Sequence, residues 1–160
     1  MKNRGIVIGI SVLLCLIWMC GCGGQTVSLD TEAAAEKLIA LDIFDEPLEK
    51  MDYDVAQKLY QIEEDQVKHA AVYTGTAAVV DEVSVWEAKD STSASKIEEA
   101  VKNRVESQKV SYASYRPEEV PKLENAVTVR KGNYVVFCVS KDSGQASAAI
   151  DALWRSDDSK

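Results

Sequence analysis

The chain has 160 residues, with 26 acidic residues against 18 basic ones and a formal net charge of −8. This charge argues against nucleic acid as a partner, because phosphates attract basic surfaces, and against a face that lies flat on anionic lipid. The length suits one domain, since domains of about 100–150 residues are the commonest.

The first 21 residues predict a signal peptide. Lys2 and Arg4 precede an uncharged apolar run from Ile6 to Met19, and Gly21 stands directly before Cys22. A small residue before a cysteine at this place is typical of a bacterial lipoprotein processing site. As a helix the run would span about 21 Å, less than the roughly 30 Å of a bilayer core, so a permanent membrane span is the weaker interpretation.

Cys22 is the predicted lipidation site. Cys20 follows Met19, which is larger than the residue that the signal peptidase pocket accepts, whereas Cys22 follows Gly21. Cleavage would make Cys22 the first mature residue, and its sulfur would carry a diacylglycerol thioether. Two acyl chains would hold the domain at the extracytoplasmic face of the cell membrane. The alternative is an ordinary secretory signal with a coincidental cysteine.

Cleavage would also change the charge and the cysteine count. Loss of residues 1–21 would leave 139 residues with 16 basic and 26 acidic side chains, a net charge of −10. Cys138 would then be the one free thiol, and no intrachain disulfide could form. Residues 22–28 are expected to form a lipidated tether, residues 29–155 a single domain, and residues 156–160 a polar tail.

Hydrophobic periodicity predicts the elements of the domain. Asp30 and Asp52 can cap two N-terminal helices that run to Leu41 and Ile62, with a turn around Pro47 between them. The period then changes to two, which indicates strands. The further elements are strands 67–74 and 79–88, a long helix from about residue 91 to Ser111 or beyond, a short helix 118–125, strands 126–130 and 134–140 around a Gly132-Asn133 turn, and a last helix from Ser143 to Trp154.

A weak internal repeat supports this order. Residues 85–95 are similar to residues 137–147, 52 positions later, and each copy reads as strand, cap and helix. We therefore predict an α+β fold with a four-stranded, mainly antiparallel sheet built from two strand-strand-helix units. The helices are expected on one face of the sheet, with two extra N-terminal helices as additional cover.

A motif between residues 104 and 135 resembles a known family. It consists of Arg104, Gln108, Ser111-Tyr112, Tyr115-x-Pro117-x-Glu119, Lys122-Leu123-x-Asn125-Ala126-Val127 and Lys131-Gly132-Asn133-Tyr134-Val135. The motif resembles a family of small lipoproteins from Gram-positive, mostly anaerobic bacteria that carry a domain of unknown function. The resemblance covers nearly all of the mature chain. It implies a single lipid-anchored α/β domain, and no activity, ligand or catalytic residue.

Four polar residues of the long helix form the candidate ligand-binding surface. Arg104, Gln108, Ser111 and Tyr115 are spaced by four, three and four positions, which places them on one helix face. A guanidinium, an amide, a hydroxyl and a phenol can together bind a carboxylate, a phosphate or a sugar, with a bidentate fork on Arg104. In the alternative interpretation Arg104 pairs with a neighbouring acid and Tyr115 packs at the sheet edge.

Catalytic and metal sites have little support. His69 is the one histidine, and a dyad with Cys138 is less expected than a buried structural role for that cysteine. One histidine and one free cysteine cannot complete a closed zinc site, so neither a metal nor another cofactor is predicted. Adjacent acids point to different faces and are interpreted as solvated surface; they are Glu63-Glu64-Asp65, Asp81-Glu82, Glu98-Glu99, Glu118-Glu119 and Asp157-Asp158.

The sequence leads to two hypotheses about function, from different classes of protein. The first is a non-catalytic, lipid-anchored binding module at the cell envelope, whose partner is an envelope protein or a cell-wall component. The second is a small envelope hydrolase that acts on wall or peptide substrates, which predicts a cleft that gathers Arg104, Tyr115 and a carboxylate. A two-lobed solute-binding protein is disfavoured because 139 residues leave too little chain for two lobes.

Overall fold

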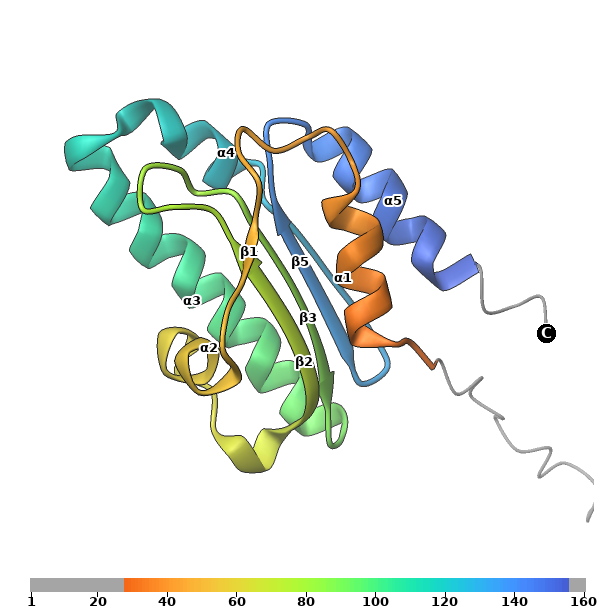
Figure 1. Ribbon diagram of the computed structural model, residues 1–160. Helices are drawn as coiled ribbons and strands as arrows, with labels where there is room; N and C mark the ends of the chain where they lie inside the picture. The colour runs from red at the N-terminus through yellow and green to blue at the C-terminus, as the bar shows by residue number, and fades with distance from the viewer. Residues whose placement is uncertain (1–27, 156–160) are drawn as a thin grey trace, which may run out of the picture.

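The computed structural model describes residues 28–155, which form three layers with a β-sheet in the middle (Figure 1). The predicted signal peptide, Cys22, the tether up to residue 27 and the tail 156–160 lie outside the described residues. Within residues 28–155, the helices are α1 (Thr31–Ile39), α2 (Tyr53–Tyr60), α3 (Ser91–Tyr115), α4 (Val120–Glu124) and α5 (Ser143–Arg155). The strands are β1 (Glu49–Lys50), β2 (Val67–Thr74), β3 (Glu82–Ala88), β4 (Val127–Lys131) and β5 (Tyr134–Val139). Two 3-10 turns, η1 (Glu64–Gln66) and η2 (Pro117–Glu119), precede β2 and α4. Among residues 28–155, no helix has the length and hydrophobicity that a membrane span requires.

The sheet is antiparallel throughout and has the strand order β1-β2-β3-β5-β4. The α+β class is therefore confirmed, but the prediction of four strands is wrong. The fifth strand, β1, consists of Glu49 and Lys50, which pair with Thr74 and Tyr73 at the end of β2. Two exposed charged residues carry no strand pattern of their own, so β1 exists through its pairing with β2.

The helices cover both faces of the sheet, and the prediction that they pack on one face is wrong (Figure 1). Trp86 and Phe137 belong to the core beneath α2, α3 and α4, whereas Val85 and Val136 belong to the core beneath α1 and α5. The helices of the two strand-strand-helix units, α3 and α5, therefore pack on opposite faces of the sheet. The physical reason is that β5 is apolar on both faces and β3 has buried apolar side chains on both, so each of these strands has to be covered twice.

The 25-residue helix α3 provides the frame for one face of the molecule. The Asp90 carboxylate accepts a hydrogen bond from the Ser93 backbone N–H at 2.7 Å, which satisfies one of the free donors at the helix start. One stripe of the helix is buried against the sheet, namely Ala94, Ile97, Val101, Val105 and Tyr112. The neighbouring stripe carries polar residues and faces α2.

The β4–β5 turn gives a first testable prediction. Gly132 has a φ of +59°, and a residue with a Cβ is strained there by about 1–2 kcal/mol. We expect Gly132→Ala to lower the free energy of unfolding in urea by about that amount. Gly144→Ala is the matched control, because Gly144 lies in the first turn of α5 without a positive φ, so alanine is not strained there. Equal effects of the two substitutions would contradict the assignment of strain to the turn.

Candidate functional site

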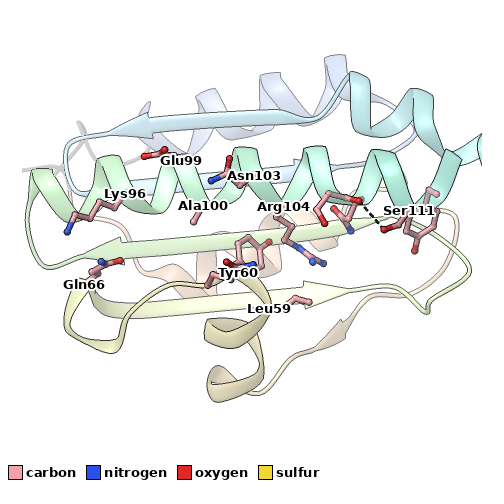
Figure 2. A pocket seen from close by; sticks show the side chains of 13 residues that line it. Leu59, Tyr60, Gln66, Lys96, Glu99, Ala100, Asn103, Arg104 and Ser111 are labelled. Atoms are coloured by element: carbon pink, nitrogen blue, oxygen red, sulfur yellow. Dashed lines mark hydrogen bonds between the residues drawn. The ribbon is translucent and has the colours of Figure 1, made fainter. Parts of the chain in front are cut away.

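A groove of about 490 Å³ lies between α3 on one side and α2 and η1 on the other (Figure 2). Figure 2 shows Lys96 and Gln66 at one end and Ser111 at the other, with Tyr60 and Arg104 between them. Polar and uncharged side chains dominate the lining. The lining residues are Leu59, Tyr60, Gln61, Gln66, Lys96, Glu99, Ala100, Asn103, Arg104, Ser107, Gln108, Ser111 and Tyr112.

Beneath the groove, a buried ion pair joins α3 to the sheet. Glu82 of β3 is completely buried, and both of its oxygens accept from Arg104, with Nε at 2.9 and 3.2 Å and Nη2 at 2.5 Å. The Tyr60 hydroxyl of α2 also donates to Glu82 and lies 3.1 Å from the Ser84 hydroxyl. The Arg104 guanidinium lies over the Tyr60 ring, at 5.0 Å from its centroid. One carboxylate therefore fixes side chains from both walls of the groove.

The electrostatics of this network keep Tyr60 protonated and Arg104 charged. The pKa of Tyr60 is well above its usual value, mainly because the phenol is buried and secondly because Glu82 is negatively charged. The phenol therefore stays protonated and remains a hydrogen-bond donor. Burial alone would lower the pKa of Arg104, but the hydrogen bonds and the charge of Glu82 raise it overall. The guanidinium is therefore a permanent cation whose charge Glu82 balances.

The predicted ligand surface is divided by the structure. Arg104, Gln108 and Ser111 line the groove, whereas Tyr115 lies outside it and is 55% exposed. The Tyr115 hydroxyl donates to the Ala77 carbonyl at 3.3 Å. Arg104 is paired with Glu82, as in the alternative interpretation of the sequence, so the edge of the guanidinium that bears Nε and Nη2 is already occupied.

A family model described as Domain of unknown function (DUF4358) matches residues 42–140, which is more than half of the chain. The chain belongs to this family. No curated protein and no solved structure matches it at a significant level. The family match confirms the domain-of-unknown-function part of the resemblance seen in the sequence. The lipoprotein character and the bacterial group remain predictions.

The matched segment of the DUF4358 family contains every strand of the described sheet and the whole groove. It starts before β1 and ends just after β5, so that α1 and α5 lie outside it. Both of these helices cover the face of the sheet opposite the groove. The part of the chain that defines the family is therefore the part that builds the groove and its buried ion pair.

A second charged cluster, buried except at Asp45, lies where α4 meets the segments that lead into β1 and β3. Lys122 contacts three carboxylates: Asp45, Asp81 at 3.1 Å and Glu119 at 3.0 Å. The Asp45 backbone N–H donates to Asp81 at 2.7 Å, and the Val80 N–H donates to Glu119 at 3.0 Å. These contacts connect segments that are distant in sequence. Within residues 28–155, no group of three or more histidines, cysteines or acids is arranged to hold a metal ion.

Three acids of the two charged clusters are buried, contrary to the prediction. The adjacent acids Asp81-Glu82 were expected at the solvated surface, but both are 0% exposed, and Glu119 is 5% exposed. The cationic partners of Glu82 and Asp81 are 22 and 41 positions away in the sequence, so residue spacing does not predict these two pairs. Sequence reasoning therefore missed that Glu82 and Tyr60 fix Arg104 in the groove.

His69 and Cys138 do not meet. In the sheet register His69 pairs with Glu87 and Cys138 with Val83, which are four positions apart on β3, or about 13 Å at 3.3 Å per residue. Cys138 is 1% exposed, which confirms the buried role predicted for it. Burial raises the pKa of its thiol to about 12. Neither residue lines the groove.

Proposed function

We propose that the protein is a non-catalytic, lipid-anchored binding module on the outer face of the cell membrane of a Gram-positive bacterium, and that its ligand occupies the α2–α3 groove. The partner is an envelope protein or a cell-wall component. The groove carries this proposal, because its polar lining rests on an ion pair whose anionic member is completely buried. A site whose side chains are held in place before the ligand arrives loses less entropy on binding.

The position of the N-terminal helix is compatible with a membrane tether. The chain enters α1 at Thr31, on the face of the sheet opposite α2 and α3 (Figure 1). A tether of residues 22–28 would reach at most about 25 Å when fully extended. An anchor attached on this side would hold the domain close to the membrane and leave the groove open to the wall.

Binding has more support than hydrolysis. The hydrolase hypothesis predicts a cleft that gathers Arg104, Tyr115 and a carboxylate. Tyr115 lies outside the groove, and the Glu82 carboxylate beneath Arg104 is completely buried. A buried carboxylate that already accepts bonds from Arg104 and Tyr60 serves to position the walls of a binding site.

The lipid anchor is tested by metabolic labelling with palmitate. We expect label on the wild-type chain and on Cys20→Ala, and none on Cys22→Ala. The Cys20 variant is a matched control, because it removes a nearby thiol and leaves the Gly21-Cys22 pair intact. Persistent labelling of Cys22→Ala would refute the anchor.

The groove is tested by photocrosslinking in intact cells. A photoreactive side chain at position 103, in the groove, should give adducts with envelope material. The same side chain at position 102 is the control, because Lys102 does not line the groove and its side chain is 63% exposed. Equal crosslinking from both positions, or none from position 103, would contradict ligand binding in the groove.

A further inference from the structure

The shape of the groove favours an elongated ligand. Its lining on α3 runs from Lys96 to Tyr112, which corresponds to about 24 Å at 1.5 Å per residue. The opposite wall is formed by the end of α2 and by Gln66 of η1. An open groove of this length, with a volume of about 490 Å³, fits a linear chain laid along α3 better than a compact molecule.

The charges of the groove balance. Lys96 and Glu99 lie one helical turn apart on α3 and have opposite signs. Arg104 is neutralised by Glu82, and an anion that bound the Nε/Nη2 edge of the guanidinium would have to displace a completely buried carboxylate. Leaving such a carboxylate without its partner is strongly unfavourable. An uncharged ligand meets no such penalty.

The hydrogen-bonding groups of the groove are mostly carboxamides and hydroxyls. The carboxamides are Gln61, Gln66, Asn103 and Gln108, and the hydroxyls of Ser107 and Ser111 lie along the same side of α3. A carboxamide both donates and accepts, and so does a sugar hydroxyl. The Gln108 Oε1 atom is buried and has no hydrogen-bond partner within residues 28–155. Leu59 and Ala100 add small apolar surfaces that suit the C–H face of a pyranose ring.

A peptide fits this groove less well. Extended peptides are commonly bound by an exposed strand edge, but the groove lies over α3 and α2 rather than along an edge strand of the sheet. A helical peptide needs an apolar groove for its anchor residues, and the lining here is mainly polar.

We propose that the α2–α3 groove binds a linear, uncharged oligosaccharide, with Asn103 and Gln108 as its main hydrogen-bonding residues. This inference rests on the proposed function in taking the groove as the ligand site and, for the source of the ligand, in placing the domain outside the membrane. It does not depend on the lipid anchor. Glycans of the cell wall are the source of such chains that a domain outside the membrane would meet.

The test is calorimetric titration of the full-length chain in a detergent without a sugar headgroup. The probes are the pentamer of β-1,4-linked N-acetylglucosamine, cellopentaose and inorganic phosphate. We expect at least one pentamer to bind and phosphate not to bind. The double variant Asn103→Ala/Gln108→Ala should bind the pentamer about tenfold more weakly or worse, which corresponds to the loss of hydrogen bonds worth about 1.4 kcal/mol. Lys102→Ala, outside the groove, should bind as the wild type does.

Ser107→Trp provides a second variant should the double variant fail to fold. Ser107 is exposed and lines the groove, so an indole there would fill the groove without disturbing the core, and binding should be lost. Binding of neither pentamer, binding of phosphate in their place, or unchanged pentamer affinity in the groove variants would overturn the proposal. Those results would leave the palmitate test untouched, so failure of the glycan assignment and failure of the anchor can be told apart.

Discussion

Glu82→Leu is expected to lower the free energy of unfolding by about 3–5 kcal/mol, because it leaves Arg104 as an uncompensated, largely buried charge in the groove. Glu82 is 0% exposed, and the Arg104 side chain is 11% exposed. The substitution also removes the acceptor of the Tyr60 hydroxyl. Urea unfolding followed by circular dichroism measures the loss. A cost below about 1 kcal/mol would show that the ion pair does not hold α3 on the sheet.

A double-variant cycle separates the ion pair from the packing around it. Replacing both partners, as in Glu82→Leu/Arg104→Met, should restore much of the stability, because apolar side chains of similar size leave no buried charge. The exposed Lys102–Glu98 pair is the comparison, since Lys102→Ala should change the free energy of unfolding by no more than about 0.5 kcal/mol.

Glu82→Leu alone should also give the groove a net positive charge, so we expect this variant to bind phosphate more tightly than the wild type does.

The Glu82–Arg104–Tyr60 network connects the fold to the proposed binding. Tyr60 comes from α2, Arg104 from α3 and Glu82 from β3, so the two walls of the groove are attached to one point on the sheet. The Tyr60 ring packs edge-on against the Trp86 ring, with centroids 5.1 Å apart, which connects the network to the hydrophobic core. A groove built in this way keeps its width when empty. Loss of the network should therefore weaken ligand binding as well as stability.

The elements that were predictable from the sequence are those with local signals. Asp30 and Asp90 accept hydrogen bonds from the starts of α1 and α3, as caps should, and Gly132 makes the turn between β4 and β5. The covering of both sheet faces by helices was not predicted, although the sequence of β5 indicates it. The run from Val135 to Val139 is apolar without alternation, and a strand of this kind is buried on both faces. The two charged residues of β1 gave no local signal at all.

The site was predictable on one helix only. The spacing of Arg104, Gln108 and Ser111 on α3 follows from helical geometry, and all three line the groove. The opposite wall depends on how α2 packs against α3, which is a tertiary contact that residue spacing cannot supply. Tyr115 shares the α3 stripe by spacing, but its hydroxyl bonds to the Ala77 carbonyl beyond the end of the groove.

Lys122→Met should also cost about 3–5 kcal/mol of unfolding free energy at pH 7, because it removes the cation shared by three carboxylates. Asp81 is 0% exposed and Glu119 is 7% exposed at the side chain, so water cannot replace the ammonium group. Urea unfolding at pH 7 measures the effect. Lys50→Met is the matched control, since Lys50 is 57% exposed and its pair with Glu32 should contribute less than about 1 kcal/mol.

The pH dependence of the Lys122→Met variant identifies the cause of this loss. Burial already raises the pKa of Asp81 in the wild type, against the opposing effects of the Asp45 N–H and Lys122. Without Lys122 the pKa of Asp81 should rise further above the value of about 3.9 in the unfolded chain. The folded variant then binds more protons than the unfolded variant, so its stability falls as the pH rises. The cost of the substitution should therefore be smaller at pH 5 than at pH 7.

A second substitution in the same background tests whether the charge of Asp81 causes the loss of stability. Asn at position 81 keeps an oxygen that can accept from the Asp45 N–H, which is 2.7 Å away in the wild type, and it removes the buried charge. Lys122→Met/Asp81→Asn should thus be more stable than Lys122→Met at pH 7 and should lose less stability between pH 5 and pH 7. If Lys122→Met cost the same at both pH values, the loss would come from packing of the lysine stem, because only a charge effect can be relieved by protonation.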